Sequence, residues 1–429
     1  MNLWSDTLLY NEDERPPLTS AVDADVVIVG GGFTGLWTAY YLKTLDSSLR
    51  ILILEAERIG FGASGRNGGW CSALYPTTAG YELVRPHLLT SIEEIGSFAH
   101  QHSPESGFVK SGTLTIARNK AQLSRLRETV TDDVALLDKE EVRSRIHMRG
   151  AIGGTFTPDC AVIHPGRLVR ALARQVEQLG VQIFEKTRAL SIESNLVKTE
   201  NASVRATSII KATEVFSQSS RHHAPIYSLM VATEPLSNEM WQEIGLAHRE
   251  TFAEALHLVN YGQRTIDNRL ALGGRGARYL FGSRLKSKHE MDHRTHMEII
   301  ELAREWFPIL KKVKFTHRWG GAVSIPRDWH PYIHWDKGGG IGSAGGYSGD
   351  GVTLSHLAGK TLGHLILERD HPITALPHVN WQNPMWEPEP LRWLGVNGSV
   401  FATDLADREE ALTQRPSFIS KRLNSFIRV

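Results

Sequence analysis

The sequence predicts an α/β protein, α+β overall, in which a helix-flanked parallel sheet is interrupted by a domain built on an antiparallel sheet. Two observations predict it. Near the N-terminus, the apolar runs at residues 26–29 and 51–54 are typical of parallel strands buried on both faces. Farther along, Ile226–Glu234 and Arg269–Gly273 alternate apolar and polar residues, which indicates antiparallel strands with one solvated face. Residues 256–261 and 313–319 continue this pattern, and Asp267-Asn268 supplies a hairpin turn.

Length and composition restrict the class of protein. A chain of 429 residues is too long for one compact core. Lys and Arg (48) nearly balance Asp and Glu (47), so charge gives no reason to expect a nucleic-acid partner. Cys71 and Cys160 form no disulfide framework and no metal spacing, which suits a reducing compartment. The N-terminal segment lacks a signal-peptide pattern, and no apolar run reaches the ~18 residues of a membrane span. We therefore expect a cytoplasmic protein without a membrane span.

The first apolar run leads into a dinucleotide fingerprint. Gly30-x-Gly32-x-x-Gly35 follows Val29 directly and opens a helix-spaced apolar segment. The second apolar run then ends on Glu55, 20 residues beyond Gly35. Strand, glycine turn, helix, strand and acid in this order predict a Rossmann-like unit. Its turn places a pyrophosphate on the helix N-terminus, and Glu55 accepts hydrogen bonds from ribose hydroxyls.

Two further glycine-rich stretches follow. RIGFGASGRNGGW, residues 58–70, is too rich in glycine for regular structure and too specific for a linker. It indicates backbone that passes close to a flat ligand, with the guanidinium of Arg66 alongside. GGYSGDGV, residues 345–352, opens a helix whose first N–H groups can meet a polar ring edge.

These motifs resemble the D-amino-acid oxidase-like superfamily of FAD-dependent amine oxidoreductases, which includes glycine and sarcosine oxidases. The similarity is greatest to the branch containing gamma-glutamylputrescine oxidase, where a GASGRNGG loop passes the flavin ring. It extends over most of the chain, through SGTLTIA (111–117), IHPG (163–166), IKATE (210–214) and IPRDWHPYIH (325–334).

The resemblance implies FAD as the cofactor. The binding is expected to be non-covalent, because the segment where sarcosine oxidases tether FAD carries no Cys. The early turn would hold the pyrophosphate and the late turn the flavin N1–C2 edge, with Asp350 capping the helix and its side chain turned away from the ring. The expected cofactor contacts are Gly30, Gly32, Phe33, Thr34, Gly35, Glu55, Ala56, Gly62, Ala63, Ser64, Arg66, Asn67, Gly68, Gly69, Ala189, Thr213, Gly346, Gly349, Gly351, Val352 and Thr353.

The resemblance also implies oxidation of a C–N bond. Arg66, Tyr347 and Arg318 are the candidate catalytic residues. A substrate carboxylate or phosphonate could be held by Arg275, Arg278 and Tyr279, although surface arginines on a loop are an equally open interpretation. His289, His293 and His296 share one helical face, but without acidic or cysteine partners at set spacing we expect a solvated face and no metal.

The predicted organisation is discontinuous. Residues 1–80, 161–220 and 336–380 form the FAD-binding domain, with a crossover helix at 165–179. Residues 81–160, expected to be mostly helical, and 221–335 form the substrate domain, and residues 381–429 form a tail of short helices. The predicted substrate is a small primary or secondary amine, such as a gamma-glutamyl polyamine or an N-alkyl amino acid, with O2 as a possible acceptor. An oxidoreductase for aminophosphonates and a non-catalytic FAD-binding subunit are the alternatives.

Overall fold

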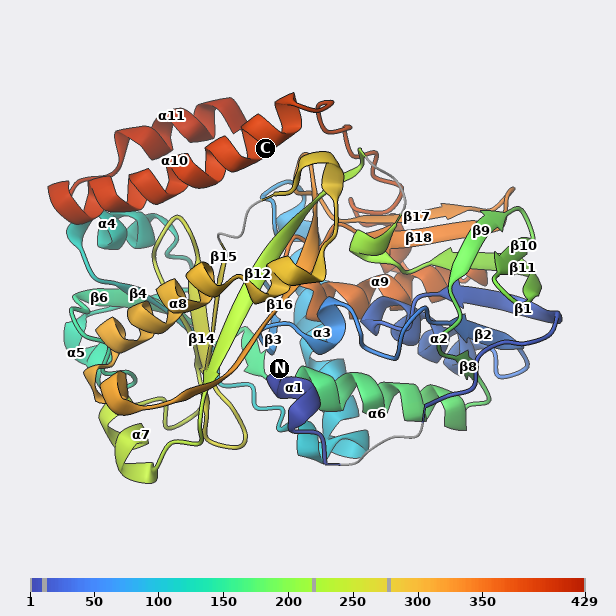
Figure 1. The fold of residues 1–429 in the computed structure, drawn as a ribbon, viewed down its shortest axis with the longest axis horizontal. Helices are drawn as coiled ribbons and strands as arrows, with labels where there is room; N and C mark the ends of the chain where they lie inside the picture. The colour runs from blue at the N-terminus through green and yellow to red at the C-terminus, as the bar shows by residue number, and fades with distance from the viewer. Residues whose placement is uncertain (1, 10–13, 218–220, 276–278, 428–429) are drawn as a thin grey trace.

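The computed structural model describes residues 2–9, 14–217, 221–275 and 279–427. The chain forms two lobes, with a parallel sheet in one and an antiparallel sheet in the other (Figure 1). A third, small sheet pairs β3 (Trp70–Ser72) with β7 (Cys160–Val162). The α-helices are α1 (Leu3–Asp6), α2 (Phe33–Leu45), α3 (Tyr81–His102), α4 (Lys120–Glu128), α5 (Lys139–Arg143), α6 (Pro165–Gln178), α7 (Asn238–Ile244), α8 (His293–Trp306), α9 (Gly351–Ile366), α10 (Leu391–Thr413) and α11 (Phe418–Ile427).

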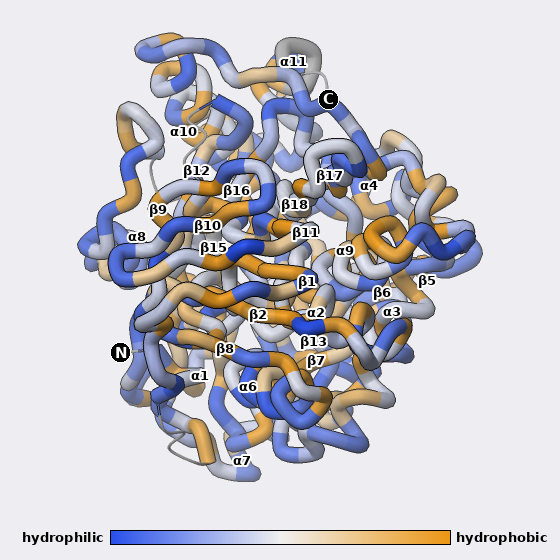
Figure 2. The backbone as a smooth tube through the Cα atoms, turned by 90° about the vertical axis from the view of Figure 1, so that its right-hand side faces the viewer, coloured by the Kyte–Doolittle hydropathy of each residue, from blue (hydrophilic) through white to orange (hydrophobic). Residues whose placement is uncertain are grey.

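The sheet of this lobe has the strand order β17-β18-β11-β1-β2-β8, with β10 and β9 continuing from β11. Its strands β18, β11, β1, β2 and β8 are parallel, while β17 and the β9–β10 hairpin pair antiparallel, and we call it the parallel sheet. Strand β1 lies between β2 and β11, parallel to both, so Val27 is level with Leu52 on one side and Ile209 on the other. The apolar runs predicted near the N-terminus are thus its central strands, which Figure 2 shows as hydrophobic stretches. The strands are β1 (Val22–Val29), β2 (Ile51–Leu54), β8 (Gln182–Phe184), β9 (Ala189–Glu193), β10 (Leu196–Thr199), β11 (Ser203–Lys211), β17 (Tyr332–Asp336) and β18 (Ile341–Gly345).

The two faces of this sheet are covered differently. Helices α2, α3, α6 and α9 share one hydrophobic core with Ile28, Ile53 and Ile210. On the opposite face, Val27 and Val29 pack with Val197 of the β9–β10 hairpin. Because all of these helices lie on one side, α2 and α9 come into direct contact and their first turns lie at the same edge of the sheet.

The antiparallel lobe is a sheet of order β16-β12-β15-β14-β13-β4-β6-β5. Helix α8 packs on one face, against Tyr227 and Leu229. The other face carries Met230 and Trp319 and meets α1 and the 58–70 loop. The strands are β4 (Thr113–Ala117), β5 (Ala135–Leu137), β6 (Gly153–Thr157), β12 (His223–Thr233), β13 (Thr251–Glu254), β14 (Asn260–Arg264), β15 (Leu270–Arg275) and β16 (Phe315–Pro326).

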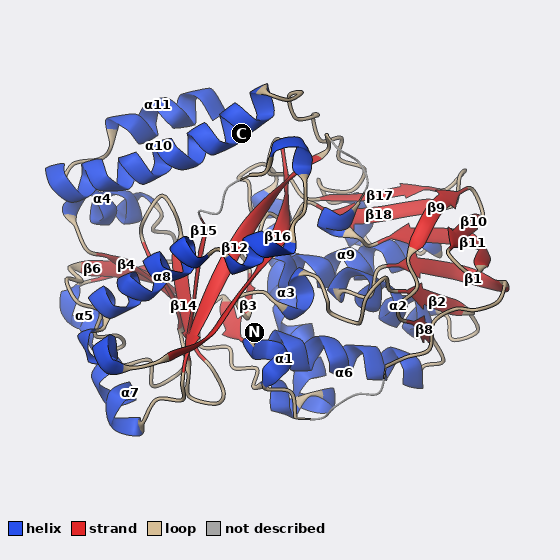
Figure 3. Ribbon diagram, viewed as in Figure 1, coloured by secondary structure: helices blue, strands red, loops and turns tan. Residues whose placement is uncertain are grey.

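The structure differs from the sequence expectations in three places. Residues 81–160 contribute strands β4, β5 and β6 to the antiparallel sheet in addition to helices (Figure 3). The strand expected at residues 256–261 is instead the connection from β13 to the start of β14. The tail contains a 23-residue helix, α10, rather than only short helices, and α11 packs against it.

Candidate active site

The early turn, residues 30–32, joins β1 to α2. Gly30 has φ = +115°, and an added Cβ would lie 2.4 Å from the carbonyl oxygen of Ala212, just beyond β11. No side chain fits there. Gly32 is the N-cap of α2 and has no side chain to cap it, while the Phe33 N–H donates to the Ser64 hydroxyl at 2.9 Å. The positive end of α2 therefore lies at the carboxyl edge of the sheet, held by the 58–70 loop.

Glu55 lies beside this turn at the end of β2. Its carboxylate accepts the N–H groups of Gly31 at 2.7 Å and Glu57 at 2.8 Å. Burial raises the pKa of this carboxyl group, and those hydrogen bonds oppose the rise. The geometry agrees with the ribose-binding acid of a dinucleotide fold, which remains its predicted role.

We call residues 65–69 the GRNGG loop. Its Asn67 side chain closes the loop on itself, because Oδ1 accepts the Gly69 N–H at 2.8 Å. Trp4 of α1 donates its indole N–H to the Asn67 carbonyl at 2.8 Å. Gln263 of β14 donates its side-chain amide to the Gly68 carbonyl at 2.5 Å. The loop is thus fixed between the N-terminal helix and the antiparallel sheet.

Tyr261 and Gln263 form a wall over this loop that the sequence analysis missed. An added Cβ on Gly68 would lie 2.4 Å from the Tyr261 ring, so the loop and β14 touch through that glycine. Trp70 meets the Tyr261 ring edge-on at 5.6 Å. The alternation of Tyr261 and Gln263 around Gly262 was visible in the sequence, but it could not show which face of the strand meets the loop.

Arg66 is paired in the structure. Its guanidinium lies 2.7 Å from the carboxylate of Glu290, donates to the Gly320 carbonyl at 3.2 Å, and stands over the Phe61 ring at 5.0 Å. Its side chain is only 11% exposed. Glu290 belongs to η5 (Ser287–Met291) in the antiparallel lobe and had not been anticipated. The two side chains bring opposite charges to the junction between the lobes.

The late turn joins β18 to α9 and contacts the early turn directly. The hydroxyls of Tyr347 and Thr34 share a hydrogen bond of 2.9 Å, so the two glycine-rich turns lie side by side although 313 residues separate this pair. Val352 and Thr353 are buried in the first turn of α9. Asp350 is the N-cap residue of α9, but its side chain makes no capping hydrogen bond, so that part of the expectation is wrong.

The other predicted cofactor residues follow the same strand ends. Thr213 lies just beyond β11 and its hydroxyl shares a hydrogen bond of 2.9 Å with Ser217. Ala189 begins β9 and packs with the core on the far side of the sheet. Their contacts remain predictions, as do those of the neighbouring residues Gly35, Ala56, Gly62, Ala63, Gly346, Gly349 and Gly351.

Of the predicted substrate residues, Tyr279 lies away from the GRNGG loop, and the catalytic candidate Arg318 does too. Tyr279 is buried against the C-terminal segment and donates its hydroxyl to Glu389 at 2.7 Å. Arg318 precedes Trp319 on β16, so it lies on the opposite face of the sheet, beside α8. Arg275 ends β15, and Arg278 lies outside the described residues.

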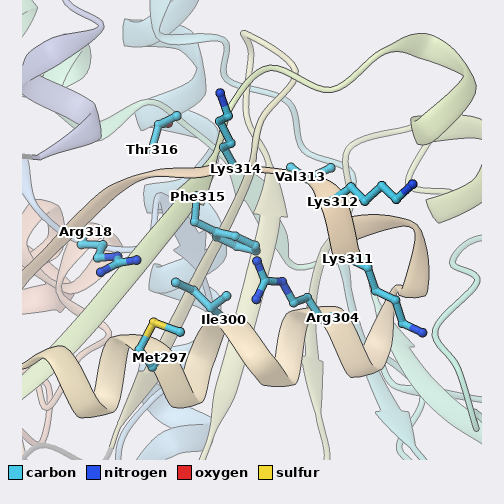
Figure 4. A pocket seen from close by; sticks show the side chains of 10 residues that line it. All are labelled: Met297, Ile300, Arg304, Lys311, Lys312, Val313, Lys314, Phe315, Thr316 and Arg318. Carbon is cyan, nitrogen blue, oxygen red and sulfur yellow. The ribbon is translucent and has the colours of Figure 1, made fainter.

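A cationic pocket of about 470 Å³ lies on that opposite face, between α8 and β16 (Figure 4). Its apolar floor includes Ile300 and Phe315. The lysine side chains at its rim point away from one another in Figure 4 and do not converge on one point. The cationic residues that line it are Arg304, Lys311, Lys312, Lys314 and Arg318.

The two thiols are unreactive, and one histidine of the predicted solvated face is buried. Burial raises the pKa of both Cys71 and Cys160 to about 12, so both stay protonated near neutral pH. His296 is buried and its Nε2 lies 3.0 Å from the Trp319 carbonyl, so the expected solvated histidine face is wrong at this position. Within the described ranges, one group has metal-ligand spacing (His257, Asp407 and Glu410), and Arg125 already forms an ion pair with Glu410.

Residues 25–365 match the model of a protein family, DAO, described as FAD dependent oxidoreductase. The chain belongs to this family. It is therefore an FAD-dependent oxidoreductase, and FAD is its cofactor. The match spans the early turn, the GRNGG loop, the antiparallel lobe and the late turn.

Relatives of known name agree with this assignment. The chain is 29% identical over 403 residues to a probable oxidoreductase, OrdL, of Haemophilus influenzae, covering 85% of this chain and 88% of that protein. It is 27% identical over 391 residues to the gamma-glutamylputrescine oxidoreductase of Escherichia coli, with 84% and 88% covered. The fold matches the crystal structure of glycine oxidase from Geobacillus kaustophilus, with a TM-score of 0.71 and 19% identity over 84% of this chain and 99% of that one. Within the described segments, no helix is long and apolar enough to cross a membrane.

The residues of this oxidoreductase fit FAD. The N-termini of α2 and α9, whose own N-cap residues make no side-chain capping bond, lie at one edge of the sheet and are joined through Tyr347 and Thr34. Helix N-termini of this kind favour anionic groups, and FAD carries a pyrophosphate and gains negative charge on reduction. FAD supplies the capacity to accept a hydride, while the chain holds and orients it.

Proposed function

We propose that this oxidoreductase oxidises the C–N bond of a small primary or secondary amine. Bound FAD would accept the hydride of the α-carbon, and water would hydrolyse the imine to a carbonyl compound and an amine or ammonia. The family supports an amine or amino-acid oxidoreductase in general, and the specific amine is the proposal. The cofactor accepts both electrons, so the protein's task is to bind and orient a neutral amine and to exclude water.

One observation carries the proposal, namely the wall at the GRNGG loop. Trp70 and Tyr261 supply aromatic surface there, and the Arg66–Glu290 pair supplies both charges. Ligand sites favour junctions of this kind, with apolar walls and few placed polar groups. A substrate carboxylate could meet Arg66, and a substrate ammonium could meet Glu290.

We therefore propose a substrate with a carboxylate, a gamma-glutamyl polyamine or an N-alkyl amino acid. The first carries a second, unreacting ammonium group that can meet Glu290, whereas the single nitrogen of the second is neutral when it reacts. The ion pair supports this choice because each partner can exchange the other for a substrate group of the same charge. The E. coli relative named gamma-glutamylputrescine oxidoreductase supports the first of these compounds. We also propose that the enzyme acts in the cytoplasm, in keeping with its two free, buried cysteines.

The test is anaerobic mixing of the purified protein with gamma-glutamyl polyamines, N-methyl amino acids and aminophosphonates while the flavin absorbance is followed. We expect bleaching by one of the first two classes, and re-admission of air then separates an oxidase from a dehydrogenase. Glu290→Gln should selectively weaken the binding of a substrate that bears an ammonium group. Tyr279→Phe, away from the GRNGG loop, is the matched control and should leave that binding unchanged. Bleaching by aminophosphonates alone would contradict the substrate proposal. Failure of every amine would contradict the proposal that the substrate is a small amine.

A further inference from the structure

Glu214 places a carboxyl group on the late turn. It follows β11 and opens η3 (Glu214–Phe216) with φ = +45°, a conformation that few residues other than glycine adopt. Its Oε1 accepts the N–H groups of Gly346 at 2.8 Å and Tyr347 at 3.3 Å. Among the residues that the structure describes, none forms an ion pair with Glu214. The carboxyl group is therefore engaged with the backbone of the turn that opens α9.

The contacts of Glu214 join three parts of the molecule. Tyr347, whose N–H donates to Glu214, also bonds Thr34 of α2 through its hydroxyl. Ser324 of β16 approaches the same carboxyl group from the antiparallel lobe. Glu214 thus holds the backbone of the late turn, while the Tyr347 hydroxyl ties the same turn to the early turn. Removal of the carboxyl group would release two backbone N–H groups of the late turn at once.

Among the described residues, no cationic side chain forms an ion pair with Glu214 to offset its charge. The titratable groups that face it are the hydroxyls of Tyr332 and Tyr347, and burial raises the pKa of both, so both are neutral. His223 stacks on Tyr332 with ring centroids 6.4 Å apart, and burial lowers its pKa to about 4. Burial likewise raises the pKa of Glu214 to about 7, although the N–H groups of Tyr347 and Gly346 oppose the rise. The carboxyl group can therefore change its protonation near neutral pH.

We propose that Glu214 is a positioning residue that holds the late turn against the early turn and takes up one proton when the bound flavin is reduced. This proposal rests on the FAD-dependent oxidation described above. Both electrons arrive with the hydride from the amine α-carbon and stay on the flavin. The additional proton comes from water and binds a carboxylate oxygen of Glu214. Negative charge gained by the flavin disfavours a second negative charge at the turn that holds it.

Two substitutions separate position from charge. Glu214→Gln keeps an oxygen that can accept both N–H groups and removes the titratable charge. Glu214→Ala removes both. Glu94→Gln is the matched control, because Glu94 is a partly buried acid on α3 whose partners, His356 and Lys360, lie beyond the first turn of α9. One measurement is the FAD affinity of the deflavinated full-length protein. The other is the flavin midpoint potential of each holoenzyme between about pH 6 and 8.5, because a carboxyl group whose pKa is raised by burial titrates in this range.

In the wild type and in Glu94→Gln we expect the flavin midpoint potential to fall with rising pH. Over part of this range its slope should correspond to two protons taken up for every two electrons. In Glu214→Gln we expect one proton per two electrons throughout, with FAD bound within about threefold of wild type. Glu214→Ala should bind FAD at least about tenfold more weakly, equivalent to ~1.4 kcal/mol. An unchanged potential profile in Glu214→Gln overturns the proposal even if the alanine variant does not fold. Neither measurement needs an amine, so failure to find a substrate leaves this test intact.

Discussion

Gly30→Ala tests the close contact between β1 and β11 at the early turn. The added methyl would lie 2.4 Å from the Ala212 carbonyl oxygen, where an ordinary contact is at least 3.4 Å, so two backbones must separate by about 1 Å. They are joined at this point by the hydrogen bond from the Ala212 N–H to the Val29 carbonyl, 2.8 Å long. Overpacking of this kind costs about 1–3 kcal/mol. Left-handed backbone at a non-glycine residue adds about 1–2 kcal/mol.

We therefore expect Gly30→Ala to lower the free energy of unfolding by about 2–5 kcal/mol and to weaken FAD retention. Urea denaturation followed by circular dichroism measures the first effect, and the flavin-to-protein ratio after gel filtration measures the second. Gly398→Ala is the control, because an added Cβ on α10 meets nothing within 4 Å. That variant should be neutral or more stable by up to about 1 kcal/mol. A Gly30→Ala protein within 1 kcal/mol of wild type that stays fully yellow would refute the reasoning.

Four further outcomes are expected. Gly32→Val should fold but purify without flavin, because its branched side chain starts 2.8 Å from the Ser64 hydroxyl and occupies the helix start; a yellow variant rules the turn out. Arg66→Ala should keep FAD and slow its reduction by substrate about tenfold in stopped flow, and unchanged kinetics would remove Arg66 from the site. Acid precipitation should release all flavin into the supernatant, whereas flavin that stays with the pellet would show a covalent link. Burial lowers the pKa of His164 and His356 to about 3 from the ordinary 6.5, so both are neutral in the native state. The free energy of unfolding should be highest above pH 6.5 and fall towards pH 3 by about 1.4 kcal/mol per pH unit for each histidine. Urea titrations at several pH values measure it, and a free energy that does not change with pH contradicts this.

Local patterns in the sequence were sufficient to predict helices and strands of the parallel lobe. The helix predicted at residues 165–179 is α6, Pro165–Gln178, because a proline at the first turn and a glycine after the end mark both limits. The run at residues 26–29 is the carboxyl half of β1, since unbroken β-branched residues suit a strand buried on both faces. These signals depend only on neighbouring residues, so a single sequence reveals them.

Contacts between distant segments were beyond such reasoning. Residues 256–261 look like a strand, yet the N–H groups of His257 and Leu258 donate to Asp407 of α10 instead of to a neighbouring strand. Arg66 could be placed on its loop, but its partner Glu290 lies in another lobe. Alternation assigned Arg318 and Trp319 to opposite faces of β16 without showing that only the Trp319 face meets the GRNGG loop.

The bond between Thr34 and Tyr347 has a consequence for biosynthesis. A ribosome delivers the first glycine-rich segment hundreds of codons before the second. If β18 and α9 enclose the flavin ring as predicted, the site is incomplete until they have been made. Flavin loading would then follow translation of nearly the whole polypeptide.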